Sequence, residues 1–149
     1  MHLVTDGAGS PLAVLVTAGQ VHESTLLEAA VEAVRLPRPG RGRPRCRPRA
    51  VAGDKGYSHR RIRRYLARRG IRAVIPRRSD QRPEDGRVKF DRELYRRRNV
   101  VERCVGRLRE YRRVGTRYEK LAASYLAVVQ VACIRQWLKQ LTTGLSDTP

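Results

Sequence analysis

Blocks of apolar and polar residues alternate along the chain and predict the order of its elements. Two apolar, β-branched segments, at 2–5 and 12–19, flank the turn sequence DGAGSP, a pattern typical of an antiparallel hairpin. In the next segment, 22–36, apolar positions recur every three or four residues. The start of the chain therefore predicts a β-hairpin followed by an amphipathic helix.

A strand–helix–strand unit is predicted next. The segment 49–54 is apolar on both faces, as buried strands of parallel sheets are, and 71–76 is a second short strand. Between them, 58–70 has helical periodicity, with Ser58 as the predicted N-cap and Gly70 as the residue that ends the helix. This order predicts two parallel strands joined by a right-handed crossover.

The rest of the chain is predicted to be helical. One helix is expected over 90–114, with a kink near Asn99, and a final helix over 121–141. The whole order is β-β-α-β-α-β-α-α, which predicts an α/β domain with a mixed sheet. We assign 1–142 to this domain and 143–149 to a frayed tail.

A stretch rich in arginine and proline, 35–49, interrupts this order. It holds seven arginines, among them Arg43, Arg45 and Arg47, and no acidic residue. Its prolines and glycines exclude a helix. Two interpretations have equal weight: a loop that lies along a phosphate backbone, and a solvated linker with no defined contact.

The net charge is extreme for the length of the chain. Lys and Arg number 33 against 14 acidic residues, which gives +19 over 149 residues. Self-repulsion of this size destabilises a compact chain unless a polyanion neutralises it. Nucleic acid is the simplest such partner, since arginine suits bidentate phosphate contacts. A merely solvated basic surface is the alternative.

Cysteine usage and hydropathy favour a cytoplasmic protein. Cys46, Cys104 and Cys133 are far apart and odd in number, which predicts reduced thiols rather than disulfides or a zinc site. The longest apolar run, 121–134, is too short to span a bilayer. We therefore expect no membrane partner.

Two of the scarce acidic residues stand out by position. Asp54 ends a predicted strand, at the edge where α/β sheets place their sites, yet Asp54 with Gly56 after it also fits a simple turn. Glu102 lies among apolar residues of a predicted helix, yet a surface salt bridge with Arg98 also explains it. Both interpretations stay open on these residues alone.

Two segments together resemble a known family. VAGDKGYSHRRIRRYLARRGIRAVIPRR, followed downstream by YRRRNVVERCVGRLREYRRVGTRYEKL, is similar to the DDE transposases of bacterial insertion sequences, in particular the IS-five-like group. The family pattern is Tyr, two residues, Arg, three residues, Glu, six residues, Lys. Tyr95, Arg98 and Glu102 fit it, and Arg109 stands where Lys is usual. The resemblance covers nearly the whole chain, including TAGQVHES.

This resemblance implies a fold and a site. The fold would be RNase H-like, with Asp54 as the second and Glu102 as the third carboxylate of a two-metal site for Mg²⁺ or Mn²⁺. Two such ions activate the attacking oxygen and stabilise the leaving oxygen of phosphoryl transfer. The residues expected to contact DNA are Tyr95, Arg98, Arg109, Lys55, Arg43, Arg45 and Arg47. Without the family, Tyr95 is equally a plain core residue.

The first carboxylate of the family's triad has no counterpart here. In the family it lies on a strand upstream of the hairpin, and Asp6 is not expected to replace it, because Asp6 sits in turn chemistry. That strand is central in an RNase H-like sheet. Either the hairpin pairs directly with the Asp54 strand, or another polypeptide is needed. We therefore expect the C-terminal part of a transposase catalytic domain, inactive alone with Mg²⁺.

The leading hypothesis is DNA transposition by metal-dependent strand cleavage and strand transfer. Its partners would be transposon ends, and an upstream transposase segment or a homo-oligomer. The alternatives are a non-catalytic basic DNA- or RNA-binding protein and an inhibitory transposase fragment. For such a bacterial protein we expect a location in the cytoplasm, at the nucleoid.

Overall fold

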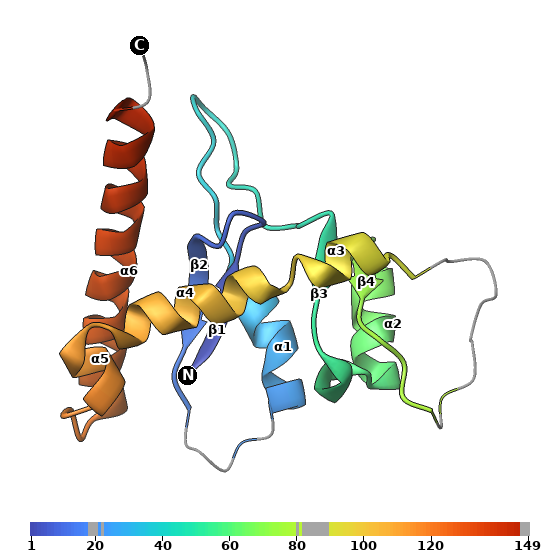
Figure 1. Cartoon of the computed structure of the whole chain (residues 1–149). Coiled ribbons are helices and arrows are strands. Elements are labelled where there is room, and N and C mark those ends of the chain that lie inside the picture. The colour runs from blue at the N-terminus through green and yellow to red at the C-terminus, as the bar shows by residue number, and fades with distance from the viewer. Residues whose placement is uncertain (18–20, 22, 80, 82–89, 147–149) are drawn as a thin grey trace. The chain divides into compact units, whose positions relative to one another are not determined.

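The computed structural model of the chain describes residues 1–17, 21, 23–79, 81 and 90–146 (Figure 1). They fall into two compact units: unit 1 comprises 1–19 and 100–149, and unit 2 comprises 20–99. The elements of unit 1 are β1 (His2–Thr5), β2 (Pro11–Leu15), α4 (Asn99–Arg109), α5 (Arg112–Thr116) and α6 (Ala122–Ser146). Those of unit 2 are α1 (Glu23–Glu32), β3 (Ala50–Ala52), the short 3₁₀ helix η1 (Lys55–Tyr57), α2 (Arg60–Arg68), β4 (Arg72–Val74) and α3 (Arg92–Arg96).

The predicted hairpin is confirmed in unit 1. β1 and β2 pair antiparallel, with Leu3 opposite Val14. Asp6 closes the turn, because its Oδ1 accepts hydrogen bonds from the backbone N–H groups of Ala8 (2.9 Å) and Ser10 (2.8 Å). Gly9 has φ +86°, a left-handed conformation that favours glycine. Asp6 is thus a turn residue, as its sequence context predicts.

The core of unit 1 lies between α4, α5, α6 and the hairpin. Its buried residues are Cys104, Leu108, Val114, Tyr125, Val129 and Ala132, and Leu3, Val14 and Val16 pack against them. The hydroxyl of Tyr125 donates to the carbonyl of Val114 at 3.0 Å, which fixes α5 on α6. One face of α6 is therefore buried within its own unit.

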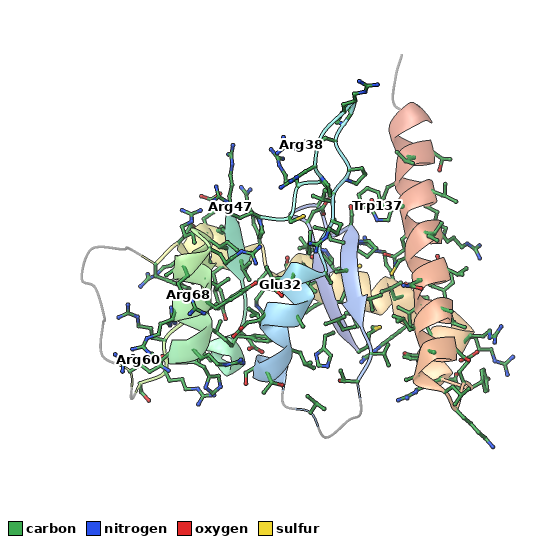
Figure 2. The ribbon with its side chains drawn as sticks, turned by 180° about the vertical axis from the view of Figure 1, so that it is seen from behind. Glu32, Arg38, Arg47, Arg60, Arg68 and Trp137 are labelled. Atoms are coloured by element: carbon green, nitrogen blue, oxygen red, sulfur yellow. The ribbon has the colours of Figure 1, made fainter. Side chains whose placement is uncertain are left out.

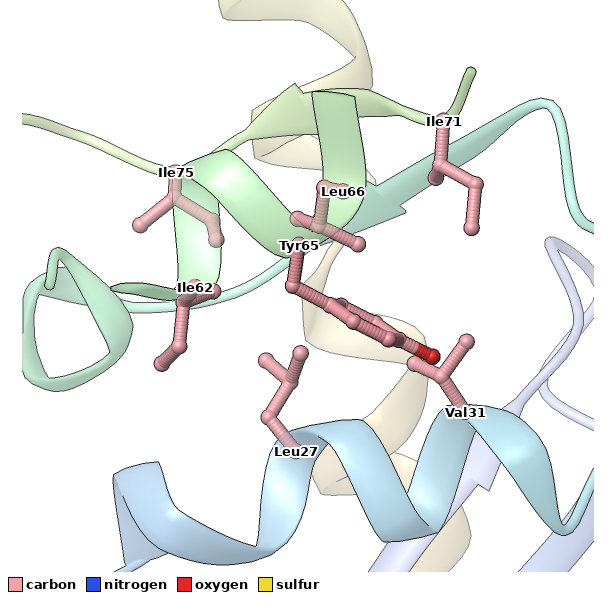
Figure 3. Packing of buried hydrophobic residues seen from close by; sticks show 7 residues of the cluster. All are labelled: Leu27, Val31, Ile62, Tyr65, Leu66, Ile71 and Ile75. Carbon is pink, nitrogen blue, oxygen red and sulfur yellow. The ribbon is translucent and has the colours of Figure 1, made fainter. Parts of the chain in front are cut away.

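Unit 2 contains the predicted strand–helix–strand arrangement. β3 and β4 are parallel, with Val51 opposite Ala73. The core joins α1, α2 and the strands, and Figure 3 shows its seven residues, Leu27, Val31, Ile62, Tyr65, Leu66, Ile71 and Ile75. Gly70, at φ +63°, ends the helical segment as predicted, and its N–H donates to the carbonyl of Ala67.

The predicted N-cap of α2 is wrong. His59 occupies the cap position without a side-chain cap bond, and Ser58 is fully buried. The Ser58 hydroxyl donates to Oε1 of Gln81 at 2.7 Å and accepts from Nη2 of Arg63 at 2.9 Å. Arg63 also donates to the carbonyls of Ile75 and Pro76, which follow β4. The Ser58 hydroxyl is therefore used in tertiary hydrogen bonds and does not cap α2.

The single helix predicted over 90–114 is three helices. Asp91 is the N-cap of α3, since its carboxylate accepts from the N–H of Leu94 at 2.9 Å, and α3 ends at Arg96, near the predicted kink. A second break follows α4, because α5 folds back so closely that a Cβ on Gly115 would lie 2.6 Å from the Arg109 carbonyl oxygen. The last helix, α6, continues past Leu141 to Ser146, and 147–149 lie outside the described residues.

The α/β class is confirmed, but the described strands do not make one mixed sheet. They form two sheets of two strands each, β1 with β2 in unit 1 and β3 with β4 in unit 2. β3 is half-buried rather than buried, with Ala52 exposed, because a pair of strands lacks neighbours on both sides.

All three cysteines are unpaired, as predicted. Burial raises the pKa of Cys104, and it raises the pKa of Cys133 to about 11, so both thiols stay protonated at neutral pH. In the described part of the chain, no helix is long and apolar enough to cross a bilayer.

The unit 2 core predicts the effect of truncating Leu66, whose side chain is fully buried. Leu66→Ala removes apolar contacts and leaves a cavity, so we expect the free energy of unfolding to fall by about 2–5 kcal/mol in urea denaturation. Ala67→Ser, at an exposed position of the same helix, should change it by about 0.5 kcal/mol or less. A decrease below about 1 kcal/mol for Leu66→Ala would contradict this packing.

Candidate functional site

Asp54 follows the carboxyl end of β3, where the sequence places it. Gly53 is buried and donates its N–H to the carbonyl of Val74, so the strand register sets the position of Asp54. The Asp54 backbone is extended, and its Oδ1 accepts the N–H of Gly56 at 2.8 Å. Asp54 thus caps η1, which confirms that it is a turn residue.

The turn bond leaves part of the carboxylate available. Asp54 is half-exposed, and among the described residues only its Oδ1 has a hydrogen-bond partner. A carboxylate oxygen of this kind is the ligand type that hard divalent cations prefer. No group of three or more His, Cys, Asp or Glu side chains gathers within the described residues. Asp54 therefore offers one carboxylate oxygen of the type that such cations bind, and no cluster of such ligands surrounds it among the described residues.

Glu102 and Arg109 lie on one face of α4. They are seven residues apart, which is almost two helical turns and about 10 Å along the axis. Both are exposed, and Glu102 stands in the first turn while Arg109 stands in the last. Gly106 lies between them, with nothing within 4 Å of where a Cβ would stand. α4 therefore presents a carboxylate and a guanidinium with bare backbone between them.

Tyr95 and Arg98 form a stacked pair in unit 2. The Arg98 guanidinium lies over the Tyr95 ring, with its central carbon 5.6 Å from the ring centroid, and Phe90 lies beside the ring at 5.4 Å. Tyr95 and Arg98 are both half-buried. The neighbouring Arg97 is exposed and forms an ion pair with Glu93 at 2.8 Å. Tyr95 holds Arg98 in place through a cation–π contact and is not a core residue.

The arginine-rich loop is exposed along 37–45 and contains no helix, as predicted. Its ends are tied together by backbone hydrogen bonds between Leu36 and Arg45, at 2.7 and 3.0 Å. Arg43, Arg45 and Arg47 are all exposed, and Figure 2 shows Arg47 on the segment that leads toward β3. Lys55 is exposed in η1. The TAGQVHES segment of the family resemblance lies partly outside the described residues.

The outer face of α2 is basic, and sequence analysis did not single it out. Arg60, Arg64 and Arg68 are exposed and four residues apart, so they follow one another along the helix (Figure 2 labels Arg60 and Arg68). Among the described residues, Arg64 and Arg68 have no ion-pair partner. The four-residue spacing of these arginines could have identified this face from the sequence. Like charges at that spacing repel one another and destabilise an isolated helix.

Two other arginines, Arg61 in α2 and Arg69 at its C-cap, have acidic partners in α1. Arg61 pairs with Glu28 at 3.0 Å, and Arg69 pairs with Glu32 at 3.3 Å. Both pairs connect α2 to α1. This segment therefore carries arginines bound to acidic residues of α1 and arginines directed to solvent, besides Arg63, which is bound to carbonyl and hydroxyl oxygens.

The turn at Asp54 predicts a difference between two substitutions. Asp54→Asn keeps an acceptor for the Gly56 N–H, so we expect a change in unfolding free energy within about 0.5 kcal/mol. Asp54→Ala removes the acceptor and should cost about 0.5–2 kcal/mol. Thermal and urea denaturation measure both. Equal stability of the two variants would show that the bond to Gly56 contributes nothing.

Comparison with known proteins assigns the chain to a family. Residues 1–137 match the family described as the transposase DDE domain. A Burkholderia cepacia protein, assigned as a transposase for insertion sequence element IS402, is 37% identical over 132 residues. That match covers 89% of this chain and 59% of the relative, so the chain spans about three fifths of the relative's length.

A second relative comes from Brucella ovis and is assigned as a transposase for insertion sequence element IS6501. It is 26% identical over 144 residues, which cover 93% of this chain and 97% of the relative. No solved structure matches the chain. Because the family match takes in almost every described residue of both units, the chain belongs to the transposase DDE domain family.

Proposed function

We propose that this chain is part of a catalytic domain that cuts and joins DNA at the ends of an insertion sequence, with divalent metal ions. The observation that carries the proposal is the ordered pair of motifs, Asp54 after its strand and Tyr95, Arg98 and Glu102 downstream, within a family match over 1–137. The proposed fold of 1–142 is RNase H-like. The α/β class and the parallel pair that ends at Asp54 support it.

Asp54 and Glu102 are the proposed metal ligands of this activity. Each is accessible, and each is positioned by its own element, Asp54 by the end of β3 and Glu102 by the first turn of α4. Magnesium or manganese ions held there would supply activation of the attacking oxygen and stabilisation of the leaving oxygen. Asp6 does not provide the remaining carboxylate, because two N–H groups hold it in the hairpin turn.

The remaining ligand is proposed to come from a segment outside these 149 residues or from another chain. The match covers 59% of the relative from Burkholderia cepacia, and the unmatched remainder of that relative supports this arrangement. The proposed partners are accordingly transposon DNA ends, together with an upstream transposase segment or a second copy of the chain.

DNA phosphates are proposed to lie on the accessible cations. Arg98 is restrained by the Tyr95 ring and so gives up little freedom when it binds, which favours it as a positioning residue. Arg109 replaces the usual Lys and offers a planar fork where a Lys would offer a compact charge. The further expected contacts are Lys55, Arg43, Arg45, Arg47 and the α2 arginines.

The carboxylate roles predict a pattern of activity. The chain with Mg²⁺ should neither nick nor join DNA. Joined to the part of the Burkholderia cepacia relative that it does not match, it should catalyse Mg²⁺-dependent strand transfer. In that joined protein, Asp54→Asn or Glu102→Gln should lower the rate on the order of a thousandfold or more, because each substitution removes a metal ligand.

The matched control is Asp6→Asn, which keeps the acceptor in the hairpin turn and should leave the rate within about threefold of the unsubstituted protein. Strand transfer is measured by gel electrophoresis of labelled end substrates. Activity that survives Asp54→Asn would disprove the metal role. Robust Mg²⁺-dependent activity of the chain alone that vanishes in Asp54→Asn would disprove the need for an outside ligand.

The α2 surface predicts a salt-dependent effect on DNA binding. Arg64→Gln/Arg68→Gln removes two cations directed to solvent, so the slope of log K against log salt should become shallower by about 0.9 for each phosphate that is no longer neutralised. Arg61→Gln/Arg69→Gln removes the same charge from arginines already paired with Glu28 and Glu32 and should change the slope less. Fluorescence anisotropy with a duplex measures both, and equal slopes would contradict a binding role for the outer face.

A further inference from the structure

The segment that connects α5 to α6 in unit 1 has more cations than it can pair (Figure 1). Residues 112–120, here called the α5–α6 corner, hold one acidic side chain, Glu119, and four cationic ones, Arg112, Arg113, Arg117 and Lys120. Nε of Arg113 donates to the Glu119 carboxylate at 2.9 Å. Among the described residues, the other three cations have no ion-pair partner, and all three are exposed. The corner therefore presents three cations to a partner with negative charge.

The backbone of the corner is fixed in a conformation that few residues adopt. Arg117 follows α5 with φ 51° and ψ 74°, in the left-handed region where glycine is the usual residue after a helix. Its guanidinium carbon lies 5.0 Å from the centroid of the Tyr125 ring, which is buried in the unit 1 core. A left-handed residue with a side chain persists only where its surroundings hold it. The chain therefore keeps a cation at a position where glycine would be less strained.

Tyr118 places an aromatic ring among these cations. It is 54% exposed and belongs to neither apolar core. Its hydroxyl accepts a hydrogen bond from Nε of Arg112 at 3.0 Å, which restrains the ring and the guanidinium together. That bond uses one of the five N–H donors of the guanidinium. The ring thus buries little surface in folding, and it lies beside donors that suit a phosphate.

An exposed ring beside cations has the chemistry of a site for unpaired nucleotides. Cations bind phosphates, and every base has a flat face that stacks on an aromatic side chain. In a duplex, the bases are already stacked inside the helix, so a ring on the protein surface does not reach them. Cations alone would be sufficient for a duplex. The ring is the feature that favours a single strand.

We propose that the α5–α6 corner binds unpaired nucleotides of a DNA strand, with a base stacked on Tyr118 and phosphates on Arg112, Arg117 and Lys120. The ring and two of the cations are restrained before binding and so lose little freedom when a strand binds. The proposal rests on the proposed function, because cutting a duplex frees strand ends whose terminal bases can unpair. It assigns this contact to residues outside the proposed metal ligands.

The test is fluorescence anisotropy of the full chain without metal, with three labelled probes of about 12 nucleotides or base pairs. The probes are oligo-dT, a strand of the same length that carries abasic sites, and a duplex. Tyr118→Ala should weaken binding to oligo-dT by roughly fivefold to a hundredfold, because a stacking contact is lost. Binding to the abasic strand and to the duplex should change by about twofold or less, since neither offers a base to the ring.

The salt dependence of binding separates the ring from the cations. Tyr118→Ala removes no positive charge, so it should lower the affinity for oligo-dT and leave the slope of log K against log salt unchanged. Arg112→Gln/Arg117→Gln should instead make that slope shallower by about 0.7 for each phosphate that is no longer neutralised.

Two other substitutions of Tyr118 are the matched controls. Tyr118→Phe keeps the ring and should bind oligo-dT within about threefold of the unsubstituted chain. Tyr118→Leu keeps an apolar side chain without an aromatic face and should weaken binding nearly as much as Tyr118→Ala. Circular dichroism and thermal denaturation should show that all variants fold alike, because the position is exposed.

Two results would overturn the proposal: oligo-dT binding that survives Tyr118→Ala, and an equal loss of binding to all three probes. Either result would assign the corner to another partner or to phosphates alone. No metal and no strand transfer enter the measurement. A failure of the proposed function, seen as activity that survives Asp54→Asn, is therefore a separate result.

Discussion

The shortage of acidic side chains is the constraint on which this structure depends. With 33 basic residues and 14 acidic ones, most cations cannot be paired within the chain. Three of the observed pairs link elements of unit 2: Arg61 of α2 and Arg69 at its C-cap pair with α1, and Arg72 of β4 pairs with Asp91 at 3.2 Å. Exposed pairs of this kind contribute little energy each. Their role is to decide which arginines are held and which stay available to a polyanion.

Arg63 is neutralised in a different way. Its guanidinium donates to the carbonyls of Ile75 and Pro76 and to the Ser58 hydroxyl, so neutral oxygens satisfy it where no carboxylate is available. The two carbonyls belong to the segment that follows β4. Because the Ser58 hydroxyl also binds Arg63, it does not cap a helix. Pairing with neutral backbone leaves the acidic residues of α1 free for Arg61 and Arg69.

Local patterns predicted the parts of the fold that local forces determine. The turn residues around Asp6 and the helical spacing of Leu27, Val31, Ile62 and Leu66 identified the hairpin, α1 and α2, because each is specified within a few neighbouring residues. The break between α4 and α5 was missed, because it depends on Val114 reaching the core formed with α6. The extent of the sheets was missed for the same reason, since strand partners are distant in sequence.

The candidate site shows the same division. Asp54 and Glu102 were identified by type, position and motif spacing, all of which are written in the sequence. The bond from Gly56 to Asp54 and the stacking of Arg98 on Tyr95 needed coordinates. The turn and the ligand are compatible interpretations of Asp54, because a turn that engages one oxygen orients the other. The basic face of α2 could not be distinguished in the sequence, because arginines are abundant throughout the chain. Only the structure shows which of them are paired with acidic residues.

Gly106 shows how stability and access oppose one another on α4. A glycine inside a helix lowers helix stability by roughly 0.5–1 kcal/mol relative to alanine, and here nothing nearby would obstruct a methyl group. The helix therefore forgoes easily available stability at the one position midway between Glu102 and Arg109. In return, the peptide backbone at Gly106 stays uncovered by any side chain of its own between Glu102 and Arg109. Selection for thermal resistance alone would therefore favour a side chain at this position and cover the backbone between the two charged residues.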